Sequence, residues 1–290
     1  MIIARLIGGL GNQMFQYACA RRVAHGLRAR LKLDLSAFET YGLRKYALDG
    51  LSVSAEVAVA EEVNVFRRRA RIRDRVPRWL LKAVPAWRYE VFQERSFAFD
   101  ARVLGLRGNF LLEGHWQSER YFSDIADIVR REFRVKAAPD ATRASLAAQI
   151  AGTSAVAVHV RRGDYVASPE TGRVHGVCGL DYYRRAVEAI ARVEPQPHFF
   201  VFSDDPAWVR QNLHLGFPTV LVERPAEGSD CEDLRLMSLC RHHIIANSSF
   251  SWWGAWLNPN PDKKVIAPQK WFSLETRDTR DLIPAGWMRI

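Results

Sequence analysis

The stretch Ser154–Tyr165 reads Ser-Ala-Val-Ala-Val-His-Val-Arg-Arg-Gly-Asp-Tyr, and it decides the fold of this chain. Its first part, Ser154–Val158, is apolar and β-branched, which is typical of a strand buried in a parallel sheet. Open α/β sheets bind their ligands at the carboxyl ends of the strands, and Arg161 and Arg162 follow this strand directly. Because guanidinium groups match phosphate oxygens in shape and charge, the stretch predicts a diphosphate site. The alternative interpretation is a surface arginine pair that closes the strand.

The composition is that of a chain with a large core. Of its 290 residues, 48% are hydrophobic and 26% are charged, which suits one large α/β domain or two of medium size. No apolar run approaches the roughly 20 residues that a membrane helix needs. The first residues, Met1–Gly8, are too short for a signal peptide and run into a Gly-rich turn. The four cysteines form no C-x-x-C pair, as expected for reduced thiols. We therefore expect a cytoplasmic protein.

Positive charge concentrates in one segment of the chain, whose net charge is +10. Eight lysines and arginines crowd residues 67–82, and tryptophan and aliphatic residues alternate with them up to Trp87. One interpretation is a basic amphipathic helix that lies on an anionic membrane at the inner face. The other is a solvated helix whose arginine stems cover local apolar surface. No RNA- or DNA-binding motif is present in the sequence, so nucleic acid is not an expected partner.

Strands and helices alternate along the chain and predict two α/β domains, residues 1–150 and 151–290. A polar, Ala-rich stretch with a helix at 141–150 separates them. The first domain is expected to contain strands at 2–7, 31–35 and 109–113, a helix at 14–26, and a basic, helical and irregular region before the third strand. The second is expected to contain strands at 155–160, 198–203, 219–223, 243–246 and 264–267, and helices at 180–193, 233–240 and 251–257.

Three further segments carry candidate chemistry. Gly8–Gln13 either lets the backbone approach a ligand at a helix amino terminus or forms a tight structural turn. Phe200–Asp205 ends a strand in two acids, and the following proline favours a helix N-cap over a D-x-D-like metal site. Ile244–Trp256 places hydroxyl residues at a helix start, which predicts a second phosphate cradle. Its tryptophans favour core packing over stacking on a substrate.

Together these blocks resemble the bacterial α-1,2-fucosyltransferases of glycosyltransferase family 11. Gly8–Ala18 resembles the opening motif of that family, and His159–Tyr165 resembles its H-x-R-R-x-D-Y motif. Phe202–Asp205 and Asn247–Leu257 resemble its two remaining blocks. Their order and spacing cover nearly the whole chain. His115–Glu119 resembles a further family stretch, in which an aromatic residue is expected at position 115.

The resemblance implies a GT-B arrangement, in which two Rossmann-like domains face each other across a cleft. The first domain would lie on the acceptor side and the second would bind GDP-β-L-fucose. The implied activity is that of a galactoside 2-α-L-fucosyltransferase, which transfers L-fucose with inversion to the 2-hydroxyl of a terminal galactoside. No metal or other cofactor is implied.

The same resemblance implies roles for particular residues. Arg161 would grip the β-phosphate with Arg162 nearby, while His159 would approach guanine and Asp233 would pair with its edge. The remaining implied contacts are Ser248, Ser249 and Phe250 to phosphate and base, Gly11 and Asn12 to the donor, and His115, Trp116 and Gln117 to the acceptor.

The general base that takes the proton of the acceptor is left open by the sequence. Asp164 is nearest to the arginines, and Glu170 and His175 are rivals. Asp164 could equally form a structural salt bridge or a turn cap, and Asn12 could contact the sugar or the bridging oxygen without acting as a base. Two other functions stay open: a transferase of the same architecture for another GDP-sugar, and a non-catalytic nucleic-acid or membrane binder. A lipid-linked acceptor would suit a membrane contact of the basic segment.

Overall fold

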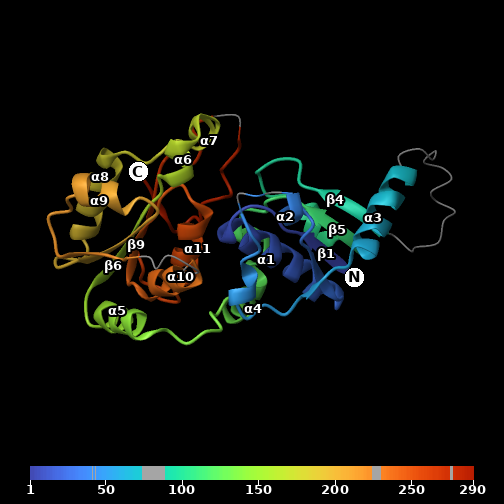
Figure 1. Ribbon diagram of the computed structural model, residues 1–290, viewed down its shortest axis with the longest axis horizontal. Helices are drawn as coiled ribbons and strands as arrows, with labels where there is room; N and C mark the ends of the chain where they lie inside the picture. The colour runs from blue at the N-terminus through green and yellow to red at the C-terminus, as the bar shows by residue number, and fades with distance from the viewer. Residues whose placement is uncertain (41, 43, 74–88, 224–229, 275–276) are drawn as a thin grey trace. The chain divides into compact units, whose positions relative to one another are not determined.

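The computed structural model describes residues 1–40, 42, 44–73, 89–223, 230–274 and 277–290, with the side chains of all of these except 69–73. Residue contacts divide the chain into two compact units. Unit 1 consists of residues 1–134 and 280–282, and unit 2 of residues 135–279 and 283–290. Each unit is built on one parallel sheet with helices packed against it (Figure 1), which confirms the predicted α/β class.

The sheet of unit 1 has the order β3-β2-β1-β5-β4, and all its strands are parallel. The strands are β1 (Ile2–Arg5), β2 (Leu31–Asp34), β3 (Glu56–Val57), β4 (Tyr89–Gln93) and β5 (Asn109–Glu113). The helices are α1 (Leu10–Leu27), α2 (Ala37–Thr40), α3 (Ala60–Arg73) and α4 (Ala126–Glu132). Short 3-10 turns lie at Leu48–Gly50, Ala101–Gly105, Glu119–Tyr121 and Ser123–Ile125.

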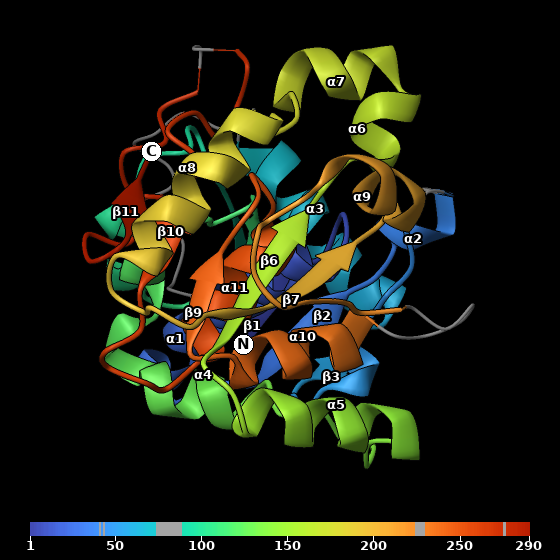
Figure 2. The same ribbon diagram turned by 90° about the vertical axis from the view of Figure 1, so that its left-hand side faces the viewer.

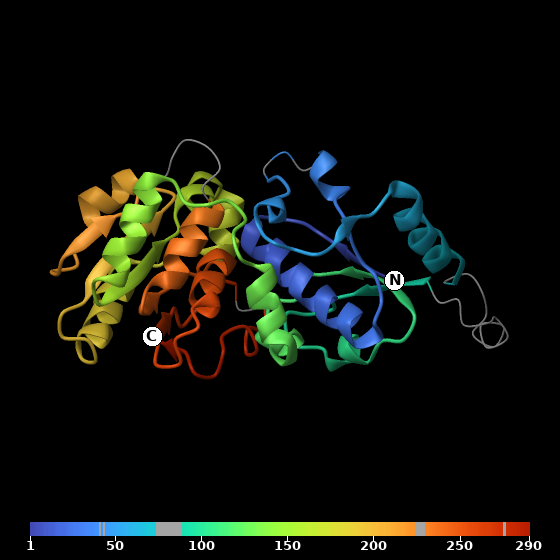
Figure 3. The same cartoon turned by 90° about the horizontal axis from the view of Figure 1, so that it is seen from below.

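Helix α1 begins four residues earlier than the sequence predicted. Gly9 is its N-cap residue, so Gly11 and Asn12 lie in its first turn and not in a separate Gly-rich turn. The side chains of Leu10, Met14 and Phe15 are buried, and this packing offsets the low helix propensity of Gly11. Helix α4 runs beside α1 (Figure 3), where the Glu132 carboxylate accepts a hydrogen bond of 2.7 Å from the Tyr17 hydroxyl.

The region between β2 and β5 contains more strand than the sequence predicted. Strand β4 pairs along its whole length with β5 and forms one edge of the sheet. Its sequence, Tyr-Glu-Val-Phe-Gln, mixes charged and apolar residues that are only half buried. An edge strand with such a sequence lacks the continuous apolar run that marks the central strands.

The sheet of unit 2 has the order β11-β10-β9-β6-β7-β8, and it is also parallel. The strands are β6 (Ala155–Val160), β7 (His198–Ser203), β8 (Thr219–Leu221), β9 (His242–Ile244), β10 (Val265–Ala267) and β11 (Met288–Arg289). The helices are α5 (Ala141–Ala151), α6 (Gly163–Ala167), α7 (Pro169–His175), α8 (Leu180–Ala191), α9 (Pro206–Asn212), α10 (Asp230–Leu239) and α11 (Ser249–Leu257).

Helices cover both faces of this second sheet (Figure 2). On one face, Tyr183, Ala186 and Ile190 of α8 pack on Val158 of β6 and its neighbours. On the other face, residues of α5 and α10 pack on the alternate residues of β6 and β7. The chain proceeds from β6 to β7 and β8 on one side and returns to β9 and β10 on the other. The carboxyl end of β6 is therefore a topological switch point, where such sheets bind ligands.

Helix α5 belongs to unit 2 by its contacts, whereas the sequence placed the domain boundary after it, at residue 150. Arg143 of α5 forms a salt bridge of 3.0 Å with Asp233 of α10. Leu146 and Ala147 of α5 also pack on the core of unit 2. These contacts explain why α5 groups with the second sheet. Among the residues that the structure describes, no helix is both long and apolar enough to cross a membrane.

Candidate functional site

The Arg161–Arg162 pair follows the central strand of unit 2, as the sequence predicted. All six residues of β6 are buried, so the strand is a rigid base for the side chains that follow it. The register between β6 and β7 pairs Val160 with Ser203. Arg161 therefore continues one strand at the point where Asp204 continues the next. The side chains of the two arginines are 20% and 18% exposed, which leaves each guanidinium partly accessible.

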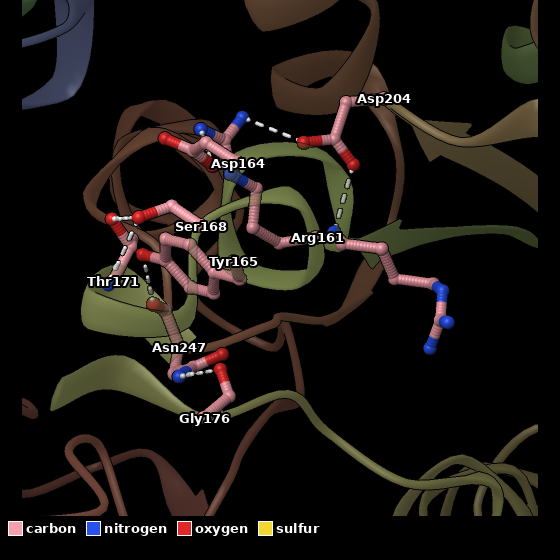
Figure 4. Close-up of polar contacts among 9 residues, drawn as sticks. Arg161, Asp164, Tyr165, Ser168, Thr171, Gly176, Asp204 and Asn247 are labelled. Carbon is pink, nitrogen blue, oxygen red and sulfur yellow. Dashed lines mark hydrogen bonds and ion pairs between the residues drawn. The ribbon is translucent and has the colours of Figure 1, made fainter. Parts of the chain in front are cut away.

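Two carboxylates hold the guanidinium of Arg161 from opposite sides (Figure 4). Its Nη2 lies 2.6 Å from Oδ1 of Asp164, and its Nη1 lies 2.9 Å from Oδ2 of Asp204. The Asp164 side chain is 41% exposed, whereas that of Asp204 is only 14% exposed. Asp204 is therefore the inner partner, and Asp164 is the partner that faces solvent. The sequence pattern predicted Asp204 only as part of a helix N-cap or of a D-x-D-like metal site, so its contact with Arg161 was missed.

Arg162 is fixed by three separate contacts. Its backbone N–H donates to Oδ1 of Asp204 at 2.8 Å, and its Nε lies 3.4 Å from Oδ2 of Asp205. Its guanidinium stacks over the ring of Trp208 at 4.0 Å. The next residue, Gly163, lets Asp204 approach closely, because a Cβ at this position would lie 2.7 Å from Asp204 Oδ2.

Asp205 caps helix α9, as the sequence predicted. Its Oδ1 accepts a hydrogen bond of 3.0 Å from the backbone of Trp208, and Pro206 opens the helix. Across the described part of the chain, no group of three or more histidine, cysteine or acidic residues is arranged to hold a metal ion. The prediction that no metal is required stays a prediction.

A stack of side chains connects Arg161 with the loop after β9. The Tyr165 ring lies 5.3 Å from the Arg161 guanidinium and 4.7 Å from the His175 ring, with which it is nearly parallel. The Tyr165 hydroxyl donates to the Asn247 carbonyl at 3.3 Å, and the Asn247 amide donates to the carbonyls of His175 and Gly176 (Figure 4). Asn247 thus ties the loop after β9 to the end of α7.

The three candidate bases have different surroundings. Asp164 lies beside Arg161, and Glu170 is exposed on α7. Burial, with a contribution from the Arg277 charge, lowers the pKa of His175. Its Nδ1 is buried and makes no hydrogen bond within the described part of the chain. These surroundings bring Asp164 and His175 to the arginine site and leave Glu170 on the outer face of the same segment.

Several other residues predicted to contact the donor lie around the start of α11. The His159 ring is buried and lies 5.7 Å from the Phe250 ring. Ser248 is the N-cap residue of α11, and its side chain makes no capping bond. The helix beyond is packed into the core, with Trp252 and Trp253 fully buried. The interpretation of these tryptophans as core residues is therefore confirmed.

Asp233 lies in a buried ion pair. Its carboxylate is 3.0 Å from the Arg143 guanidinium, and both side chains are only 3% exposed. Arg143 also donates to the carbonyl of Glu223 at 3.1 Å. The pair fixes the orientation of Asp233 on α10. Its contact with a guanine base stays a prediction.

Beside the arginine site, unit 2 contains a cavity of about 310 Å³ at the carboxyl ends of β9 and β10. It is lined on one side by His175, Asn247 and Phe272, and on another by Arg185 and Lys270. This cavity could not be predicted from the sequence, because its lining comes from five separate segments.

In unit 1, the predicted donor and acceptor contacts meet at the carboxyl edge of the sheet. The Gln117 amide donates to Oδ1 of Asn12 at 2.8 Å, which joins the turn after β5 to the first turn of α1. The His115 ring stacks on Phe97 at 5.6 Å. Trp116 is buried, with 1% exposure of the whole residue, so its predicted acceptor contact stays a prediction.

Glu94, which follows β4, was missed together with that strand. Its carboxylate accepts hydrogen bonds from the backbone N–H groups of His115 and Trp116, at 2.7 and 3.0 Å. Burial raises the pKa of Glu94. The sequence offered one signal for this residue, an acid that directly follows a segment of mixed polar and apolar residues.

Two parallel α/β sheets, with an arginine pair at the switch point of the second, form the Rossmann-like architecture that GT-B glycosyltransferases have. The chain belongs to glycosyl transferase family 11, whose family model matches residues 1–290. An Escherichia coli alpha-1,2-colitosyltransferase is 35% identical over 298 residues, which cover 100% of this chain and 99% of that protein. The Escherichia coli O-antigen biosynthesis glycosyltransferase WbnK is 31% identical, and the match covers 92% of this chain and 94% of that protein.

A solved structure supports the fold assignment. The structure of an Arabidopsis thaliana FUT1 mutant in complex with GDP matches with a TM-score of 0.51 at 10% identity. The match covers 92% of this chain and 70% of that chain. At this identity the likeness shows the fold alone.

Proposed function

We propose that this chain transfers L-fucose from GDP-β-L-fucose, with inversion, to the 2-hydroxyl of a terminal galactoside. The product is an α-1,2-fucosylated oligosaccharide or surface polysaccharide. The observation that carries the proposal is the Arg161 guanidinium, held at the carboxyl end of β6 between Asp164 and Asp204. The motif that contains it resembles the arginine motif of α-1,2-fucosyltransferases.

The arginines would act on the leaving group. When the bond between fucose and phosphate breaks, its electron pair stays with GDP, and negative charge grows on the β-phosphate. Charge-assisted hydrogen bonds from Arg161 strengthen with that charge, so they favour the transition state over the bound substrate. Around the nucleotide we place His159, Arg162, Asp233, Ser248, Ser249 and Phe250, and toward the sugar Gly11 and Asn12.

Asp164 would act as the general base. The acceptor 2-hydroxyl loses its proton to the carboxylate, and its oxygen forms the new bond to the anomeric carbon as GDP departs. Asp164 is the more exposed of the two carboxylates on Arg161, so an incoming diphosphate would displace it and free it for this step. Glu170 and His175 remain the rivals, and His115, Trp116 and Gln117 would bind the acceptor.

A second donor is favoured by the similarity to the alpha-1,2-colitosyltransferase, which extends over the whole chain. Colitose is L-fucose without the 3-hydroxyl. A site built to hydrogen-bond that hydroxyl rejects the deoxy sugar by several orders of magnitude, whereas an apolar site discriminates weakly. The preference between GDP-fucose and GDP-colitose therefore reports which sugar the site has been built for.

The test is a product assay with linkage analysis. The chain is incubated with GDP-fucose, GDP-colitose or GDP-mannose and a panel of terminal galactosides that includes lactose. Transfer of fucose to the 2-hydroxyl at the highest kcat/KM supports the proposal. A preference for GDP-colitose would assign the second donor, and transfer from neither would refute both. Activity that survives chelation with EDTA would support the absence of a metal requirement.

We further propose a lipid-linked acceptor at the inner membrane face. This idea rests on the basic segment 67–87, most of which lies outside the described residues. Of the two cations described there with their side chains, Arg67 pairs with Asp34 at 3.1 Å and Arg68 is exposed. Retention of the protein by vesicles of anionic lipid at moderate salt would support the contact, and failure to bind them would remove its basis.

A further inference from the structure

The turn after β5 is held by a buried carboxylate from the neighbouring strand. Strands β4 and β5 run side by side at the edge of the unit 1 sheet (Figure 1), so Glu94 after β4 comes next to Gly114 after β5. The backbone N–H groups of His115 and Trp116 both donate to Glu94, one to each carboxylate oxygen. One side chain thus satisfies two successive amides of a turn that has no regular structure.

The turn is strained at Trp116. Its φ is 56°, in the left-handed region that residues with a side chain rarely adopt. Such a conformation persists only where the surrounding contacts enforce it, and it is concentrated at functional sites. The Trp116 ring packs on Phe92 and on the edge of Tyr121, while Glu94 holds its N–H.

Gly114 makes room for this arrangement. A Cβ at residue 114 would lie 2.4 Å from Cβ of Glu94 and 2.9 Å from Cε2 of Trp116. The backbone at Gly114, just after β5, therefore approaches Glu94 more closely than a residue with a Cβ atom would allow. The close approach of Gly114 to Glu94 and the strained backbone of Trp116 are two independent observations. Both indicate that the surrounding structure fixes the position of the Glu94 carboxylate.

The held turn presents a polar edge toward α1. The next residue, Gln117, donates to Asn12, which joins the carboxyl ends of β4, β5 and β1 through side chains. Carboxyl ends of parallel strands are where such sheets bind ligands. Hydroxyl-rich sugars are held in proteins by amide and carboxylate groups of this kind, fixed in orientation by their neighbours.

We infer that Glu94 is a positioning residue of the acceptor site, which keeps the His115–Gln117 turn in the strained form that binds the acceptor sugar. This rests on the proposed function, in which that turn contacts the galactoside. Glu94 acts through the two amides and does not itself take part in bond formation. Its loss is expected to weaken acceptor binding while donor binding is kept.

The test compares Glu94→Gln with Glu113→Gln. A glutamine at 94 offers one oxygen to the two amides and turns its NH₂ group toward the other, so one N–H loses its acceptor. Glu113 lies on the adjacent strand and pairs with Arg5 at 3.3 Å, so its variant removes a nearby charge without touching the turn. The readouts are KM for lactose, KM for GDP-fucose, and hydrolysis of GDP-fucose without acceptor.

For Glu94→Gln we expect KM for lactose to rise roughly ten- to a hundredfold, the effect of losing a hydrogen bond to a charged group. KM for GDP-fucose and its hydrolysis should change less than twofold, and Glu113→Gln should match the wild type. Glu94→Asp, which keeps the charge on a shorter side chain, should give an intermediate KM. Equal losses in donor and acceptor parameters would overturn the inference, because they would mark Glu94 as structural.

Hydrogen exchange provides a readout that does not need activity. The amides of residues 115 and 116 should exchange faster in Glu94→Gln than in the wild type and in Glu113→Gln. If Glu94→Gln does not fold, Glu94→Asp is used in its place. Unchanged exchange would overturn the inference. A wild-type chain that transfers fucose to none of the terminal galactosides of the panel, with this exchange pattern intact, would instead refute the proposed function.

Discussion

Replacing Asp204 tests whether the arginine site depends on its inner carboxylate. Asp204 makes two charge-assisted contacts, 2.9 Å to the Arg161 guanidinium and 2.8 Å from the Arg162 backbone N–H. Hydrogen bonds to charged groups contribute about 1.5–3 kcal/mol each. The side chains of Asp204 and Arg161 are 14% and 20% exposed, so solvent weakens part of this electrostatic contribution. We expect Asp204→Ala to cost about 2 kcal/mol of unfolding free energy.

The loss of activity should exceed the loss of stability. Without Asp204, Arg161 keeps Asp164 as its acidic partner within the described residues. Its guanidinium is then expected to move away from the strand end. A misplacement of about 1 Å at a reacting group can reduce the rate about 100-fold. We therefore expect kcat/KM for GDP-fucose transfer to fall roughly 10- to 100-fold. Asp204→Asn keeps an oxygen for the Arg162 N–H, so its loss should be smaller.

Asp205 supplies the matched control. It is the next residue in the chain, it caps α9, and its contact with Arg162 is longer, at 3.4 Å. Asp205→Ala should lose about 1 kcal/mol of stability through the cap and keep kcat/KM within about threefold. Initial rates measure kcat/KM, and urea unfolding measures the stability. Equal activity losses for the two variants, or near-wild-type activity of Asp204→Ala, would refute the positioning role.

Further predictions concern single residues of the same unit. Arg161→Ala should reduce kcat about 10²–10³-fold with the fold retained, and Arg161→Lys should also be poor because a point charge cannot replace the planar fork; near-wild-type kinetics would contradict both. Asp164→Asn should bind GDP more tightly in calorimetry but transfer fucose more slowly, whereas Glu170→Gln should keep the wild-type rate. Burial lowers the pKa of His243 from 6.5 to about 3 in the folded chain. As the pH falls, the unfolded chain therefore takes up a proton at this histidine before the folded chain does. Stability should then fall as the pH drops below about 6.5, by up to roughly 1.4 kcal/mol per pH unit until about 3. In His243→Gln, the free energy of unfolding, measured with urea, should depend less steeply on pH over this range.

The central strands could be predicted from the sequence because their burial is written in continuous apolar runs. The predicted bounds at 109–113, 155–160 and 198–203 coincide with β5, β6 and β7. The edge strand β4 was missed because half-buried edge positions accept charged residues. The start of α1 was missed because a glycine pattern describes local propensity, whereas the burial of Leu10 and Met14 decides where the helix begins.

Two site residues were not predicted from the sequence, and the reason is the same for both. Asp204 and Glu94 each act on a neighbouring strand, Asp204 on the residues after β6 and Glu94 on the turn after β5. Such contacts depend on the pairing and register of strands that lie about 20 to 40 residues apart. Register is not visible in a single segment. Once β6 and β7 are known to end together, however, the pairing of Arg161 with Asp204 follows directly.

The charges at the arginine site support the proposal that Asp164 moves when the donor binds. Two guanidinium groups, Arg161 and Arg162, face three carboxylates, those of Asp164, Asp204 and Asp205, so these five side chains carry a net negative charge. A diphosphate brings further negative charge, so its binding to Arg161 would be favoured by the withdrawal of a carboxylate. Asp204 is fixed by the Arg162 N–H and Asp205 by its helix cap. Asp164, exposed and on a short helix, is the one that can leave. Donor binding would thereby turn a salt-bridge partner into a free base.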